Sequence, residues 1–310
     1  MTAFNIVFPI FGLIFLGMLF RKRGWIKEEA FTQINSLLYW VAIPSLLFIK
    51  FAKLGSIAID IEDFFLAFLG ATLSAVALGY ILALVLGLGR VKIGAFVQAT
   101  YRGNLAFVGL PIALHYLTQS QAQRLEGLVF LSLSPMIITY NLLGVGLLVA
   151  HGEKSQGQIR KGLMKVATNP LILSCGFGLI FRMLELSLPL AIDRSLSILG
   201  QMVVPLALIT VGGSVQFNRG EKQVHASFFA AAGKTMATPL LGLFFARWIG
   251  LGLEETLTLM LFLAAPTAAA AYILAKQLGS DAKMTANAIL VGTLLSLISV
   301  MGIFAWAGTA

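Results

Sequence analysis

The chain has 310 residues, of which 58% are hydrophobic and only 11% are charged, whereas a soluble domain carries about 25% charged residues. Apolar runs of about 18 residues or more recur from end to end, which is typical of membrane-spanning helices. The formal charge of +9 belongs mainly to short loops between these runs, so membrane topology explains it better than nucleic-acid binding does. The composition therefore indicates a polytopic α-helical membrane protein with almost no soluble mass.

The residues that usually hold metals or form disulfides are few and scattered. Cys175 is the single cysteine, which excludes an internal disulfide and a cysteine-based metal cluster. The three histidines, His115, His151 and His225, fall in different segments. We therefore expect no metal site and no cofactor.

Ten apolar segments follow one another along the chain, and each is expected to span the membrane. They cover residues 3–20, 31–52, 64–89, 93–117, 126–150, 163–184, 193–215, 225–250, 255–277 and 284–307. About 20 residues, rising about 1.5 Å each, cross a hydrocarbon core of about 30 Å. The first segment is followed, not preceded, by the basic cluster Arg21–Arg23, so it is interpreted as a retained span rather than a signal peptide.

Basic residues gather in every second loop. Most of the 22 Lys and Arg residues lie between spans 1 and 2, 3 and 4, 5 and 6, 7 and 8, and 9 and 10. The positive-inside rule places these loops in the cytoplasm and both termini outside, and we expect a multi-pass protein of the plasma (inner) membrane. Arg102 and Lys234 are exceptions because they fall well within spans.

The two halves of the chain look related. FGLIF at Phe11–Phe15 recurs at Phe177–Phe181, and Ser36–Leu46 aligns with Ser197–Ala207 at nearly the same separation, proline on proline. Because each half holds five spans, the second copy would cross the membrane upside down as an inverted repeat; chance similarity between apolar segments is the alternative. The predicted organisation is a first five-helix repeat over 1–150, a cytoplasmic linker over 151–162 and a second five-helix repeat over 163–310.

The fourth and ninth spans carry residues that disfavour helix. The fourth contains RGNLAFVGLP, Arg102–Pro111, and the ninth contains LFLAAPTAAAAYIL, Leu261–Leu274. Glycine and proline weaken or break helices, and in lipid a broken helix survives only inside protein or beside a water-filled cavity. The repeat places Pro266 opposite Asn104, and paired interruptions of this kind point to a transport site.

These two motifs, GNLAFVGLP and APTAAAAYILAKQLG (Ala265–Gly279), together with ten spans and a short central loop, resemble the bacterial auxin efflux carrier family. That family belongs to the bile acid, arsenite and riboflavin transporter superfamily, and the resemblance covers essentially the whole chain. It implies a scaffold domain, a transport domain, two broken helices crossing at the midplane, an elevator-like motion and often a homodimer. Bacterial members are associated with small organic acids such as malonate and malate, and plant relatives with auxin. The long cytosolic loop of many plant relatives is missing here, which argues against auxin as the substrate.

The candidate substrate-binding residues lie on the two broken spans and on the eighth span. They are Arg102, Gly103, Asn104, Gly109, Pro111, Lys234, Ala265, Pro266, Thr267 and Tyr272. Half-helix N-termini attract anions, and the Asn104 amide and Thr267 hydroxyl can orient a carboxylate. The alternative for the two glycines is close helix packing.

Arg102 and Lys234 decide the expected charge of the substrate. Each lies about 13 Å from the cytoplasmic end of its span at the helical rise, where a charge is either functional or snorkels to the interface. If both face the cavity, the substrate should be an anion. No acidic residue lies inside a span by this count, which disfavours coupling through a buried acid and an intramembrane enzyme. We therefore expect a secondary carrier for small organic anions such as mono- or dicarboxylates, with the lipid bilayer as its surroundings and no nucleic-acid partner; an anion channel or pore is the alternative.

Overall fold

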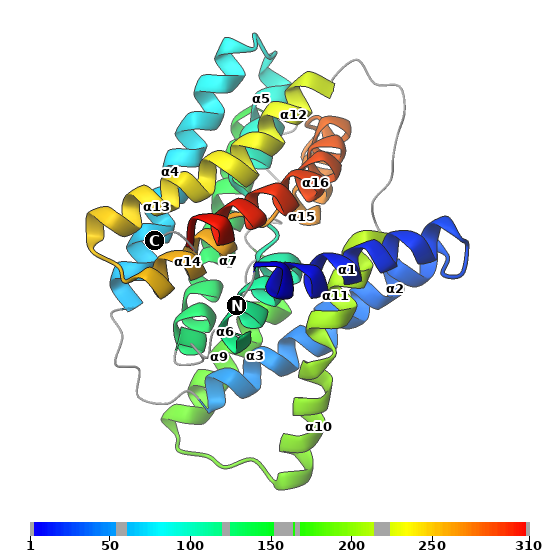
Figure 1. Cartoon of the computed structure of the whole chain (residues 1–310), viewed down its shortest axis with the longest axis vertical. Coiled ribbons are helices and arrows are strands. Elements are labelled where there is room, and N and C mark those ends of the chain that lie inside the picture. The colour runs from blue at the N-terminus through cyan, green and yellow to red at the C-terminus, as the bar shows by residue number, and fades with distance from the viewer. Residues whose placement is uncertain are drawn as a thin grey trace. The chain divides into compact units, whose positions relative to one another are not determined.

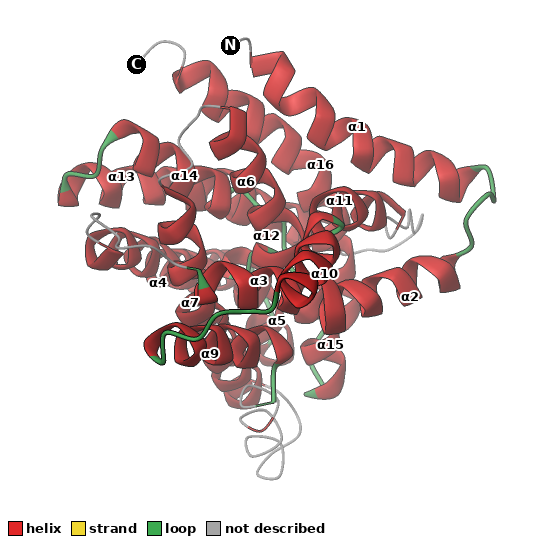
Figure 2. Cartoon of the chain, turned by 90° about the horizontal axis from the view of Figure 1, so that it is seen from below, coloured by secondary structure: helices red, strands yellow, loops and turns green. Residues whose placement is uncertain are grey.

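The computed structural model describes residues 3–53, 61–119, 125–151, 164, 168–213 and 224–307. Within these ranges every regular element is a helix, and the β structure is confined to an isolated bridge between two residues (Figure 2). The expected all-α class is therefore confirmed. Apart from its first residue, His151, the predicted linker 151–162 lies outside the described residues.

The helices follow the expected apolar segments. In chain order they are α1 (Ala3–Lys22), α2 (Glu28–Leu37), η1 (Leu38–Ala42), α3 (Ile43–Ala52), α4 (Ile61–Val85), α5 (Arg90–Tyr101), η2 (Leu105–Gly109), α6 (Leu110–Gln119), α7 (Glu126–His151), α9 (Pro170–Met183), α10 (Leu190–Gln201), α11 (Val203–Gly213), α12 (Val224–Ala232), η4 (Gly233–Ala237), α13 (Thr238–Ile249), α14 (Leu253–Leu263), α15 (Ala269–Gln277) and α16 (Ala282–Ala307). The elements named η are π-helical turns.

Six stretches of continuous helix in the described part are long and apolar enough to cross a membrane. They are Glu28–Ala52, Ile61–Val85, Glu126–His151, Leu190–Gly213, His225–Ile249 and Ala282–Ala307. The fourth and ninth expected spans are instead interrupted, each between two shorter helices. The protein is thus a multi-pass membrane protein, while the full count of ten spans and the inverted repeat stay predictions.

The chain forms two compact units. Unit 1 comprises Met1–Ile61, Ala106–Ile137 and Ala167–Val215, and unit 2 comprises Glu62–Leu105, Ile138–Val166 and Gln216–Ala310. Each unit contains segments from both halves of the sequence, so the two units do not correspond to the two predicted repeats. The repeat boundaries at 150 and 163 stay predictions.

Each π-helical turn in the described part of the chain is followed by a proline at the same spacing. Pro44, Pro111 and Pro239 lie two residues after the ends of η1, η2 and η4, respectively. Proline lacks a backbone N–H, and its ring clashes with the carbonyl four residues earlier, which in each case belongs to the π turn. A wider turn relieves that clash without ending the helix. A proline therefore accompanies each of these three deviations from α geometry, although Pro9 and Pro135 lie inside α1 and α7 without a π-helical turn.

In unit 1, α1 packs along α11, and α3 packs against α9 and α10 (Figure 1). The close approach of α1 to α11 depends on Gly17 and Gly212, since a Cβ on either would collide with a backbone carbonyl of the other helix, at Ile209 and Ile14. Small residues allow this kind of backbone contact between membrane helices.

In unit 2, α12 and α15 pack against α16, and α13 packs against α14. The helix α5 contacts α12, α16 and η4, and Phe96 of α5 joins a buried apolar cluster with Leu148, Ala275 and Met284. The C-terminal end of α5 is therefore held inside this unit, which places the interruption of the fourth span in its interior.

Candidate functional site

The two interrupted spans meet through their backbones inside unit 2. The N–H of Asn104 donates to the Pro266 carbonyl at 2.8 Å, and the N–H of Ala268 donates to the Arg102 carbonyl at 2.9 Å. These bonds set Gly103 opposite Thr267 in an antiparallel bridge. Unwound backbone cannot stay unpaired away from water, and here each break supplies the partners of the other. We call this region, Arg102–Asn104 with Ala264–Ala268, the crossing.

Side-chain hydroxyls complete the crossing. The Thr267 hydroxyl donates to the Ala99 carbonyl at 2.8 Å, and Ala99 lies in the last turn of α5, whose carbonyls have no helical partner. The Thr238 hydroxyl donates to the Gly233 carbonyl at 2.9 Å, where the π turn η4 widens the helix. Gly292 of α16 packs behind the crossing, its Cβ position lying 3.6 Å from Cβ of Pro266.

Lys234 lies beside the crossing and is completely buried. Its ammonium donates to the carbonyl of Leu263, the last residue of α14. A Cβ at Gly103 would lie 3.2 Å from Nζ and 2.9 Å from Cε of Lys234. The lysine side chain therefore also packs against Gly103, just after the end of α5. The C-terminal ends of helices carry partial negative charge. Lys234 therefore places a cation where two interrupted helices end, and it does not snorkel to the surface.

Arg102 is the second buried cation, with 5% of its surface exposed. Its Nη1 donates to the Tyr140 carbonyl at 2.9 Å and its Nη2 donates to Oδ1 of Asn141 at 2.7 Å, both on α7. The Tyr101 hydroxyl donates to the same Tyr140 carbonyl at 3.3 Å. Arg102 thus turns inward to α7, and within the described part of the chain neither it nor Lys234 forms an ion pair with a carboxylate.

Gly144 makes this contact with α7 possible. A Cβ at position 144 would lie 2.5 Å from Nε2 of Gln98 and 2.7 Å from Nη1 of Arg102. Because Gly144 lies one helical turn after Tyr140, its missing side chain leaves the Tyr140 carbonyl open to donors from α5. Sequence reasoning missed Gly144, Tyr140 and Gln98, although two glycines and a Tyr–Asn pair in an apolar run were a visible signal.

The structure brings together most of the residues expected at the site. Those in the crossing or in contact with it are Arg102, Gly103, Asn104, Lys234, Ala265, Pro266 and Thr267. Gly109 and Pro111 belong to unit 1, at the junction of η2 and α6, and Tyr272 is half-buried on α15. The roles of these residues in substrate binding stay predictions.

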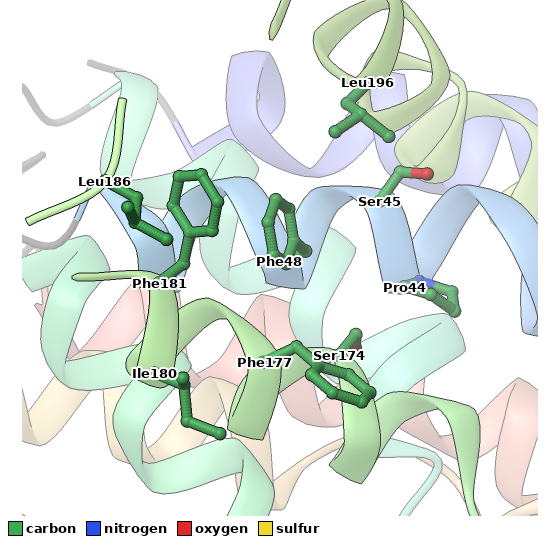
Figure 3. A pocket seen from close by; sticks show the side chains of 9 residues that line it. All are labelled: Pro44, Ser45, Phe48, Ser174, Phe177, Ile180, Phe181, Leu186 and Leu196. Atoms are coloured by element: carbon green, nitrogen blue, oxygen red, sulfur yellow. The ribbon is translucent and has the colours of Figure 1, made fainter. Parts of the chain in front are cut away.

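Unit 1 contains a separate cavity of about 460 Å³ between α3, α9 and α10. Figure 3 shows the rings of Phe48 and Phe181 at this cavity, 5.6 Å apart between centroids. Its polar side chains are Ser45 and Ser174, whose hydroxyls donate to carbonyls of their own helices at 2.7 and 2.9 Å. The cavity therefore offers no charge to an anion, unlike the crossing.

Comparison with known proteins agrees with this architecture. The family model described as "Membrane transport protein" matches residues 2–304. The chain is 27% identical to a "Putative malonate transporter" of Rhizobium meliloti, over 96% of this chain and 94% of that one. It is 26% identical to an "Uncharacterized transporter" of Methanocaldococcus jannaschii over 99% of both chains, and 25% identical to one of Methanothermobacter thermautotrophicus over 97% of both. The chain therefore belongs to the membrane transport protein family, which is the auxin efflux carrier family that its motifs resemble.

Proposed function

We propose that the protein is a secondary carrier, working by efflux or exchange, for small organic anions such as mono- or dicarboxylates. The observation that carries this proposal is the pair of buried cations at the crossing. Arg102 and Lys234 contact carbonyl and amide oxygens, and no described carboxylate neutralises them.

Burying an ammonium or guanidinium without a counter-ion costs several kcal/mol. Neutral oxygens and the C-terminal ends of α5 and α14 carry only partial negative charge. They therefore offset only part of that cost. A substrate anion bound beside the two cations would supply full opposite charge. Charged groups buried in membrane-spanning segments commonly mark substrate pathways, which supports an anion rather than a cation or a neutral solute.

Further support comes from similarity and from the type of site. A relative that is 27% identical over nearly the whole chain is named as a malonate transporter, and malonate is a small dicarboxylate. Interrupted helices that meet at a site are a recurrent feature of secondary transporters. An alternating-access, elevator-like mechanism would assign the crossing in unit 2 to the transport domain and unit 1 to the scaffold. The resemblance further suggests a homodimer in the inner membrane with both termini outside.

A substrate panel tests the proposal. Purified protein in liposomes is preloaded with one compound, and uptake of a radiolabelled mono- or dicarboxylate is measured against competing anions, cations and neutral sugars. We expect saturable uptake that small carboxylates inhibit and cations and sugars do not. Exchange of cations or neutral solutes alone would contradict the anion assignment. The channel alternative predicts open-pore currents in planar bilayers, whereas a carrier gives saturable flux without them.

A further inference from the structure

Gln98 is a buried polar residue that the crossing does not account for. It lies on α5, one helical turn before Arg102, and its side chain is completely buried. Neither Nε2 nor Oε1 has a hydrogen-bond partner among the described residues. A buried polar atom without a partner costs about 1–3 kcal/mol, and such atoms are rare in folded proteins. An amide with both atoms unpartnered is therefore a candidate to contact a bound ligand.

The amide lies next to the Arg102 guanidinium. Nε2 of Gln98 and Nη1 of Arg102 approach the same point on α7, 2.5 and 2.7 Å from the Cβ position of Gly144. The guanidinium has five N–H donors, of which the bonds to Tyr140 and Asn141 use two. One small ligand can therefore contact both side chains, with its negative charge toward Arg102.

The hydrogen-bonding capacity of the amide restricts the chemistry of that ligand. An amide donates through Nε2 and accepts through Oε1, whereas an ionised carboxylate only accepts. A simple carboxylate would satisfy Arg102 and Nε2 but would leave Oε1 without a partner. A ligand that also carries a hydroxyl beside its charge satisfies both amide atoms, because the hydroxyl donates to Oε1.

We propose that Gln98 is a specificity-determining residue that selects, among organic anions, those with a hydrogen-bond donor next to the charged carboxylate. The chemical class is 2-hydroxy acids. This inference rests on the proposed function, because it refines which anions the same site accepts. In the present conformation Gln98 and Arg102 are enclosed, so the inference requires a state of the transport cycle in which the contact of α5 with α7 opens.

Two pairs of anions that differ by one hydroxyl test the inference. Counterflow rates in proteoliposomes are compared for lactate against propionate and for malate against succinate. We expect the wild type to prefer the hydroxylated member of each pair, and Gln98→Met, which keeps the length but not the amide, to reduce that preference about tenfold, since a satisfied amide atom is worth about 1.4 kcal/mol. Gln98→Asn, which retains a shorter amide, should keep part of the preference. Gln201→Met, at an exposed position at the end of α10, is the matched control and should keep all of it.

The ratio within each pair does not depend on how much protein folds, and the Gln98→Asn variant covers the case in which Gln98→Met fails to fold. Equal losses for both members, with an unchanged ratio, would show that the amide holds only a buried water and would overturn the inference. A wild type that transports all four anions without preference would also overturn it, while leaving the anion carrier intact. Transport of cations alone, or of none of these four anions nor any other carboxylate of the substrate panel, would contradict the proposed function itself.

Discussion

At the scale of single residues, the proposed anion site rests on two buried cations. Arg102 contacts α7 through a backbone carbonyl and an amide, and Lys234 contacts the end of α14. The sequence placed both within spans but left their orientation open, because a long basic side chain can reach either a cavity or the interface. Orientation depends on acceptors such as the carbonyls of Tyr140 and Leu263, which any residue could supply, so sequence reasoning had no signal for them.

Replacing Arg102 by alanine should lower transport more than about tenfold, because charged hydrogen bonds are worth about 1.5–3 kcal/mol each and the substrate loses its cationic partner. Initial rates of carboxylate uptake, corrected for reconstituted protein, measure this effect. The matched control is Arg247→Ala, an exposed arginine of α13 in the same unit, which should leave uptake near the wild-type rate. Wild-type uptake in the Arg102→Ala protein would show that Arg102 does not contribute to substrate binding.

Replacing Lys234 by methionine should also reduce uptake, since it retains most of the side-chain volume at the crossing but removes the cation. The same loss should appear as a higher KM for the anion, because less positive charge remains to bind it. Lys276→Met, at an exposed position of α15, serves as the control. If the Lys234→Met protein keeps the wild-type KM, Lys234 serves only to cap α14.

At the scale of elements, the sequence predicted where the fourth and ninth spans are interrupted. It did not predict the contacts with α7 that stabilise the interruption of the fourth span. The interruptions at Gly103 and Pro266 agree with local chemistry, since glycine and proline disfavour helix, although Gly144 and Pro239 lie within helices. The pairing of Asn104 with Pro266 also agrees with the predicted alignment of the two halves. The contact with α7 was not foreseen because it depends on Gly144, whose effect arises only when α5 packs against it.

The Gly144→Ala substitution should displace the ends of Gln98 and Arg102, since the new methyl group would meet them at 2.5 and 2.7 Å. Overpacking of this kind costs about 1–3 kcal/mol, so we expect a lower thermal stability in detergent together with weaker uptake. Gly146→Ala, two residues further along α7, is a matched control because no atom lies within 4 Å of its Cβ position. Equal behaviour of the two variants would show that α7 does not position Arg102.

At the scale of the whole molecule, the ion pairs that the structure describes and the two buried cations lie in different units. In unit 1, Arg21, Lys50 and Lys53 form partly exposed ion pairs with Glu28, Glu126 and Asp193. In unit 2, the buried cations of the crossing have no described carboxylate partner. The unpaired buried cations therefore support the proposal that unit 2 binds an anion.

The most direct test of anion carriage through the crossing is trans-stimulated exchange. Proteoliposomes with and without internal unlabelled malonate are given external radiolabelled malonate, and initial uptake is compared for the wild type and the Arg102→Ala variant. The proposed mechanism predicts saturable uptake that internal malonate accelerates in the wild type and that is lost in the variant. Uptake that does not saturate, or that proceeds equally in both proteins regardless of internal malonate, would contradict it.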